Sequence, residues 1–155
     1  PGAPADPVQI IDVRDLATWI IAAIDAGTVG VFNAIGPKKT LTVGTMLEAC
    51  RKAAGSDAKL TWVDASFLEA KEVAPWSDMP VWVPPIGDSA GFSRISSKKA
   101  IDRGLTFRPV EATIKDTLEW WKTLPADRQA KLKAGISRER EAVVLKAWHE
   151  KSKTP

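Results

Sequence analysis

The chain has 155 residues, 45% of them hydrophobic and 26% charged, a composition that excludes a chain too polar to form a core. Its formal net charge is +3, but the 22 basic residues are spread among 19 acidic ones, which argues against nucleic-acid binding because that class needs a basic patch. No apolar run approaches the roughly 20 residues of a membrane span. The single cysteine, Cys50, excludes an internal disulfide, and we expect a cytoplasmic protein.

The chain begins with a loop and then a strand–helix unit. Residues 1–7 are rich in proline and alanine, and the β-branched run at residues 8–11 is typical of a buried strand. Asp12 is the expected N-cap of a helix that ends at Gly27. The inward face of this helix is expected to contain Val13, Leu16, Ala17, Ile20, Ile21 and Ile24, whereas Trp19 lies off that face.

The same alternation continues to about residue 70. Residues 29–35 and 59–63 predict two further strands. Between them, Thr42 is the expected N-cap of a helix that ends at Gly55, and Cys50 falls on its inner face as a buried structural thiol. The stretch from Ser66 to Glu69 matches a capping box that begins a short helix. This order predicts the α/β class, with short strands alternating with helices.

Residues 75–85 then form a segment with four prolines and two tryptophans, which no long helix can cross. We expect a structured loop, and long loops in compact domains are often functional. Since small-molecule pockets usually have apolar and aromatic walls, Trp76, Met79 and Trp82 are candidate substrate-binding residues. The alternative is that these side chains form a cover packed on the core.

The last part of the chain predicts a helical C-terminal end. Residues 92–96 suggest a short strand and residues 97–103 a helix, and a longer helix follows Pro109 with Trp121 facing inward and Trp120 at the rim. Residues 125–155 predict a helical extension, whose apolar positions are Val144, Leu145 and Trp148. We therefore divide the chain into an α/β domain at residues 1–124 and this extension.

The residues needed for common catalytic chemistries are missing from the sequence. The only histidine, His149, lies in a charged helix and is expected to be exposed, so it cannot activate a nucleophile. One histidine and one cysteine do not make a zinc site. The sequence contains neither a G-x-G-x-x-G turn nor a phosphate-binding P-loop. We therefore predict no catalytic, cofactor-binding or metal-binding residue in this chain.

Several motifs together resemble one enzyme family. Residues 7–17 (PVQIIDVRDLA) resemble an "x-I-x-V-x-D-L-A" segment, and residues 32–37 (FNAIGP) resemble an "F-N-x-x-G" strand end. Residues 96–100 and 104–109 are similar to an "S-x-K-A…L-G-F/W-x-P" passage, and residues 113–121 to a "T-x-x-D-T-x-x-W" helix. In this order and spacing the motifs resemble the C-terminal, substrate-side part of extended short-chain dehydrogenase/reductases of the NAD-dependent epimerase/dehydratase family.

The resemblance implies a Rossmann-type parent enzyme that binds NAD or NADP through an N-terminal half. In that family a Tyr and a Lys of a Y-x-x-x-K motif are catalytic, but this chain has no tyrosine. It would bind the small-molecule substrate and perform no chemistry. Arg94 stands near a position where family members place a substrate-facing residue, and is a further candidate. Val8 stands where some nucleotide-sugar epimerases have Arg, which argues against a sugar-nucleotide substrate.

Two other readings remain open. The chain could be a self-standing module that binds a small molecule or a protein, and RNA binding is a third reading. Because the chain begins at Pro1, we expect a piece of a longer protein. A piece cut from an enzyme exposes the surface that met the other half, so we expect self-association, or disorder near residues 1–7.

Overall fold

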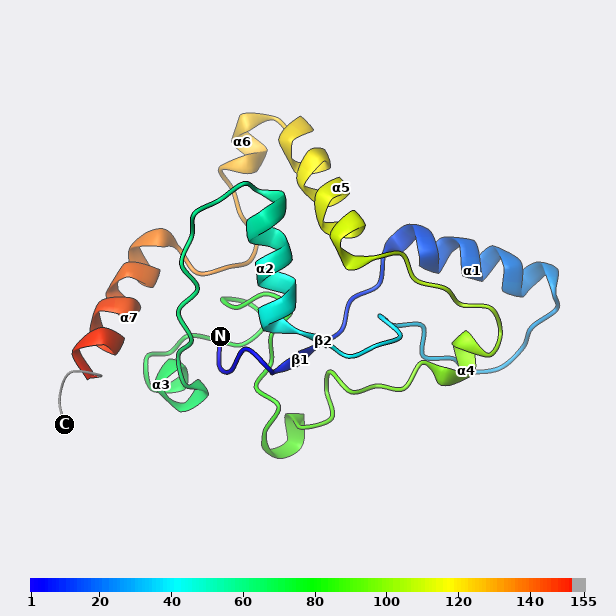
Figure 1. Cartoon of the computed structure of the whole chain (residues 1–155), viewed down its shortest axis with the longest axis horizontal. Helices are drawn as coiled ribbons and strands as arrows, with labels where there is room; N and C mark the ends of the chain where they lie inside the picture. Colours follow the sequence, from blue (N-terminus) through cyan, green and yellow to red (C-terminus); the bar gives the residue numbers. More distant parts are fainter. Residues whose placement is uncertain (152–155) are drawn as a thin grey trace.

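A computed structural model describes residues 1–151 (Figure 1). The structure is mixed α/β, with seven α-helices and one two-stranded sheet in that range. The elements are β1 (Pro7–Val8), α1 (Val13–Asp25), β2 (Leu41–Thr42), α2 (Val43–Ala53), α3 (Ala65–Ala70), the 3₁₀ turn η1 (Gly87–Ser89), α4 (Lys98–Ile101), α5 (Val110–Thr123), α6 (Ala126–Gln129) and α7 (Arg138–Lys151). Among these residues no helix is long and apolar enough to cross a membrane.

The predicted caps of the first two helices are confirmed. The Asp12 carboxylate accepts a hydrogen bond from the Arg14 amide at the start of α1, and the Thr42 hydroxyl accepts one from the Thr45 amide at the start of α2. Each side chain satisfies a first-turn amide that has no partner inside its own helix. Gly27 follows α1 with a φ of +60°, a left-handed conformation that suits glycine at a helix end.

The predicted inward face of α1 is confirmed at Leu16 and is wrong at its other five positions. The helix buries Trp19, with Leu16 and Ala23 partly buried beside it, and the Trp19 indole donates a hydrogen bond to the Arg103 carbonyl at 3.0 Å. The opposite side carries an exposed row that we call the apolar stripe: Val13, Ala17, Ile20, Ile21 and Ile24. The periodicity identified the apolar positions of α1 but not the face that packs against the rest of the chain. Trp19 offers that contact a larger apolar surface than an isoleucine does.

Helix α2 packs against α5, as Figure 1 shows, and buries Val43, Met46 and Ala49. Cys50, which we expected to be buried, is exposed. Cys50 lies one turn after the buried Met46 on the same helix face, so the cover over that face ends before the last turn of α2. The expected capping box at Ser66 is also wrong, because α3 begins at Ala65 without a side-chain cap.

Most of the predicted strands do not form ladders in the described residues. Only Pro7 and Val8 pair with Thr42 and Leu41, in antiparallel register, so the predicted strand at residues 8–11 is shorter than expected. Residues 29–35, 59–63 and 92–96 were predicted as strands and are irregular instead. A strand needs a neighbouring strand to satisfy its backbone groups, and in the described residues these three segments have no such neighbour.

The core lies between β1, α2, α3 and the C-terminal helix. Its fully buried members include Val8, Leu68 and Trp82, and Val144 of α7 belongs to the same cluster. Residues 1–6 are attached to this core by two backbone hydrogen bonds. The Val43 amide donates one to the Asp6 carbonyl, and the Val63 amide donates the other to the Pro1 carbonyl. A second cluster consists of Trp19, Ala100 and Leu105.

Candidate functional site

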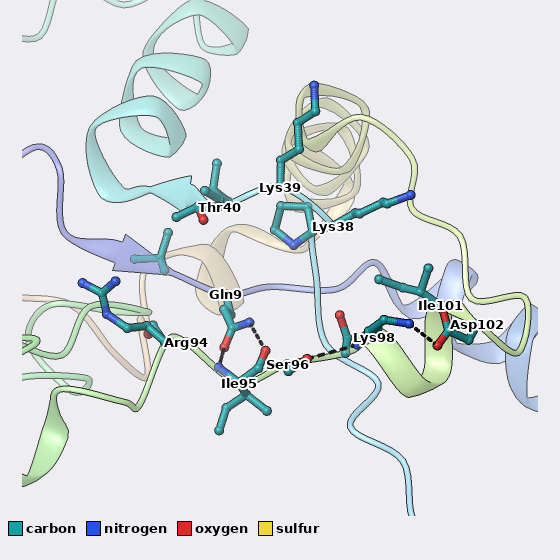
Figure 2. A pocket seen from close by; sticks show the side chains of 15 residues that line it. Gln9, Lys38, Lys39, Thr40, Arg94, Ile95, Ser96, Lys98, Ile101 and Asp102 are labelled. Atoms are coloured by element: carbon teal, nitrogen blue, oxygen red, sulfur yellow. Dashed lines mark hydrogen bonds and ion pairs between the residues drawn. The ribbon is translucent and has the colours of Figure 1, made fainter.

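A cleft of about 590 Å³ lies beside β1 and β2, and we call it the basic cleft. Its lining contains four basic side chains and one acidic side chain: Lys38, Lys39, Arg94, Lys98 and Asp102. Figure 2 shows Arg94 on one side of Gln9 and the Lys98–Asp102 pair on the other. Lys38 and Lys39 lie above them, on the segment that leads into β2. Among these four basic side chains, only Lys98 has an ion-pair partner within residues 1–151, which is Asp102 at 2.6 Å.

Gln9 forms the wall behind this cleft. Its side-chain amide donates a hydrogen bond to the Ile95 carbonyl at 2.9 Å, and its amide oxygen accepts one from the Ile95 backbone N–H at 2.9 Å (Figure 2). The side chain thus joins, as a rung of a ladder would, two segments that were each predicted as a strand. Because both polar ends of Gln9 are used, the residue positions the wall and is not a free ligand-binding group.

On the other side of the same wall lies a second cavity, of about 520 Å³, which we call the aromatic cavity. Its large apolar side chains are Phe32, Ile35, Trp76, Phe92 and Ile95, and its polar side chains are Gln9, Asn33 and Ser93. Trp76 meets Phe92 edge-on, with ring centroids 5.6 Å apart, within the range of roughly 4.5–7 Å that aromatic pairs favour. The two cavities share Gln9, Ser93 and Ile95.

The four predicted substrate-binding residues are therefore separated by the structure. Arg94 lines the basic cleft and Trp76 lines the aromatic cavity, so these two lie on the two sides of one wall. Trp82 is 1% exposed, and its indole N–H donates to the Asp6 carboxylate at 2.9 Å. Met79 is partly buried against the same core and lines neither cavity. For Trp82 and Met79 the structure matches the alternative reading, a cover packed on the core.

A further groove, of about 440 Å³, lies between α3 and residues 82–89. It is lined by the edge of Trp82 and by Val83, Pro84 and Ile86, with Glu69 and Glu72 at its side. No basic side chain lines it, and it shares no residue with the other two cavities.

The helix ends in this chain do not fit a dinucleotide cofactor. A dinucleotide pyrophosphate sits on free amides at the start of a helix that follows a strand. The first amides of α2 are taken, since Val43 donates to the Asp6 carbonyl and Gly44 to the Pro4 carbonyl. The start of α1 carries the Asp12 carboxylate, which would repel a pyrophosphate. Neither helix start therefore fits a dinucleotide pyrophosphate.

Other reactive groups are scattered. No group of three or more His, Cys, Asp or Glu side chains that could hold a metal ion occurs in the described part of the chain. His149 is exposed on α7, as expected. Partial desolvation raises the pKa of the Cys50 thiol, which disfavours the nucleophilic thiolate. The geometry thus supports binding, and the described residues do not assemble a nucleophile with its base.

Sequence reasoning missed several residues of the two cavities. Gln9 was part of a predicted strand, and its polar side chain within an apolar run was the available signal. Lys38 and Lys39 follow Gly36-Pro37 directly, and adjacent cations after a turn could have marked them. Phe32 and Phe92 gave no comparable signal, because their meeting with Trp76 depends on how three distant segments pack.

Comparison with protein-family models, with characterised proteins and with solved structures gives no match to this chain.

Proposed function

We propose that this chain is the substrate-side part of an NAD(P)-dependent oxidoreductase or epimerase, and that a Rossmann-type half outside residues 1–155 binds the cofactor. The observation that carries the proposal is an open backbone edge beside an exposed apolar helix face. The motifs of the extended short-chain dehydrogenase/reductases, which the sequence resembles, lie on both features.

The open edge is the segment 29–35. None of its backbone amides donates a hydrogen bond within residues 1–151, and its contacts come from side chains: Lys99 donates to the Val31 carbonyl at 2.8 Å and Asn33 to the Ser96 carbonyl at 3.4 Å. Val29 and Val31 are the most exposed of the large hydrophobic side chains in the described residues. An extended, β-branched segment with unpaired amides is suited to join the edge of another sheet.

The apolar stripe of α1 supports the same partner. Val13, Ile21 and Ile24 are each more than 60% exposed, and they lie on one side of a helix whose other side is already packed. Soluble proteins rarely leave a contiguous apolar row open to water. Since α1 leads directly into the open edge through Gly27, one partner layer that adds a strand beside residues 29–35 can also cover the stripe.

Within such an enzyme, this chain would hold the substrate. The basic cleft and the aromatic cavity are both built by residues of this chain, and they provide charge on one side of Gln9 and apolar surface on the other. The chain would orient the substrate and exclude water from it, and the proton and hydride transfers would be performed by the other half.

Hydrogen–deuterium exchange tests the proposed contact. The product of the native gene and the isolated chain of residues 1–155 are compared at the amides of residues 29–35. We expect fast exchange in the isolated chain and strong protection in the native product, whereas the amides of α2 are protected in both. Equal, fast exchange at residues 29–35 in a native product that contains further residues would contradict the proposal.

The alternative, a self-standing module that binds a small molecule or a protein, is favoured by the fact that both cavities are complete within this chain. It predicts a native gene product near 16.8 kDa that stays monomeric. The first proposal predicts a mass near twice that value.

A further inference from the structure

Of the basic cleft, the aromatic cavity and the groove beside α3, only the aromatic cavity includes part of the open edge. Residues 32–35 contribute to its lining, whereas no residue of segment 29–35 lines either of the others. A sheet that pairs with residues 29–35 would therefore border the aromatic cavity. Because the described residues assemble no nucleophile with its base, the reacting part of a substrate has to lie at this border, within reach of the other half.

Trp76 is held in place at this cavity by hydrogen bonds, although its backbone is unfavourable. Its φ is +67°, in the left-handed region that bulky residues seldom adopt. The Trp76 amide donates to the carbonyl of the buried Trp82 at 3.0 Å, and two residues earlier the Ala74 amide donates to the Asp78 carboxylate at 2.8 Å. Strained positions of this kind persist only where the surroundings enforce them, and they cluster at binding sites.

Trp76 and Phe92 form an aromatic surface that is open to solvent. Trp76 is 56% exposed and Phe92 is 51% exposed, although the two rings contact each other and both line the aromatic cavity. Phe32, Ile35 and Ile95 extend the apolar lining. A planar ring packed on Trp76 and Phe92 would remove this apolar surface from water, and aromatic rings pack well on one another in edge-on and offset arrangements.

The polar side chains of the lining are all uncharged: Gln9, Asn33 and Ser93. Both polar ends of Gln9 are bonded to Ile95. The Asn33 side chain donates to the Ser96 carbonyl at 3.4 Å, but within residues 1–151 its oxygen accepts no hydrogen bond, and the Ser93 hydroxyl has no partner there. The cavity thus offers one free acceptor and one free hydroxyl to a ligand.

No cation lines the aromatic cavity in the described part of the chain. The Lys99 ammonium lies 4.4 Å from the centroid of the Phe32 ring and donates to the Val31 carbonyl, and this lysine is not part of the lining. Arg94 lines the basic cleft, on the other side of the Gln9 wall. An ionised group in the aromatic cavity would lose water without meeting an opposite charge, which is far more costly than the burial of a bonded hydroxyl or carbonyl.

We propose that the aromatic cavity is a binding site for an uncharged planar ring that carries a hydroxyl or a carbonyl group. Trp76 and Phe92 pack on the ring. The Asn33 oxygen accepts a hydrogen bond from a hydroxyl, or the Ser93 hydroxyl donates one to a carbonyl. This inference rests on the proposed function, since it names the class of the substrate and places it at the border with the cofactor-binding half, but the site itself uses residues of this chain only.

Three probes of similar size test the site on the chain of residues 1–155: 2-naphthol, the anion 2-naphthoate, and decahydro-2-naphthol, whose saturated rings are not planar. The Trp76 indole N–H signal in ¹H–¹⁵N spectra reports the affinity at this cavity. We expect 2-naphthol to bind at least about fivefold more tightly than 2-naphthoate, because the carboxylate has no opposite charge to meet. It should also bind at least about fivefold more tightly than the saturated alcohol. Equal or weaker binding of 2-naphthol in either comparison, or a Trp76 signal that does not move, would overturn the proposal.

A pair of variants locates the binding by calorimetry with 2-naphthol. Trp76→Ala should weaken binding at least about fivefold. Trp120→Ala is the matched control, because Trp120 has the same exposure of 56% and lines neither the aromatic cavity nor the basic cleft. Equal losses in the two variants would overturn the proposal. The titration of the unmodified chain, in which the Trp76 signal moves and the Trp120 signal stays in place, does not depend on the folding of either variant.

The product of the native gene distinguishes a substrate site from a surface that the other half covers. We expect 2-naphthol to bind the native product as well, with the same dependence on Trp76. Loss of this binding in a native product that contains further residues would show that side chains of the other half fill the cavity. That result would overturn the inference and leave the proposed function standing. Absence of exchange protection at residues 29–35 would overturn the proposed function and leave probe binding by the isolated chain unchanged.

Discussion

The Thr113 hydroxyl donates a hydrogen bond to the Asp12 carboxylate at 2.8 Å and so joins two helices across 101 residues of sequence. The Arg14 guanidinium donates a hydrogen bond to the same carboxylate and forms an ion pair with Asp116 of α5 at 2.6 Å. Arg108 pairs with the neighbouring Asp15. These residues belong to the motifs on which the family resemblance depends. In this chain, the motifs fasten the start of α1 to α5 and line no part of the basic cleft.

This network makes stability depend on pH. Hydrogen bonds from Arg14 hold the pKa of Asp12 well below its ordinary value, and bonds from Arg108 lower the pKa of Asp15. A carboxylate whose pKa is lower in the folded state stabilises the fold above its unfolded pKa, about 3.9, and loses this contribution as the pH falls towards the folded value. We expect the free energy of unfolding in urea to drop below about pH 4.

The variant Asp12→Asn should lower stability at pH 7 and flatten this acid dependence, because the amide cannot accept the same set of charged bonds. Asp57→Asn, in an exposed loop, is the matched control and should change neither. An acid profile of Asp12→Asn identical to that of the unmodified chain would show that the network does not set the pH response.

The buried Trp82 should contribute more to stability than any exposed tryptophan. Trp82→Phe removes the hydrogen bond to Asp6 and leaves a cavity in the core, so we expect a loss of about 1–3 kcal/mol in urea unfolding. Trp120→Phe, at an exposed position, should stay within about 0.5 kcal/mol. Similar losses in both would contradict the placement of Trp82 in the core.

The apolar stripe should make the isolated chain self-associate. Ile21→Glu places a charge in the stripe and should shift the chain towards monomer in sedimentation velocity, because burying a charge in an apolar contact is costly. Val143→Glu on α7 is a matched control, since Val143 and Ile21 are both 61% exposed. An unmodified chain that is monomeric at all concentrations would contradict this expectation.

The exposed Cys50 should react with a maleimide in the folded chain, at one equivalent per chain. Partial desolvation raises the pKa of this thiol, so labelling at pH 7 should be slower than that of a free cysteine and should accelerate as the pH rises. Labelling that requires a denaturant would restore our original expectation of a buried thiol.

Local signals predicted the helices well. Asp12 and Thr42 cap α1 and α2 as expected, because a cap depends on a side chain and an amide only two or three positions apart. The helix after Pro109 begins at Val110, and Val144 of α7 reaches the core. These features are encoded within one or two turns of the chain.

Features that depend on a distant partner were not predictable from the sequence. The face of α1 that turns inward depends on Phe32 and Leu105, because both pack against Trp19 in the second hydrophobic cluster. The segment 29–35 has strand-like residues but no ladder, since nothing within residues 1–151 pairs with it. Arg94 and Trp76 line cavities, whereas Trp82 is buried and its indole donates a hydrogen bond to the Asp6 carboxylate, a partner 76 residues away in sequence.

The most direct test of the proposed function is a fluorescence titration of NADH and NADPH into two samples: the product of the native gene and the isolated chain of residues 1–155. The account predicts that the native product, with a mass near twice 16.8 kDa, binds one of the two cofactors, and that the isolated chain binds neither. Cofactor binding by the isolated chain, or a larger native product that binds neither cofactor, would contradict it.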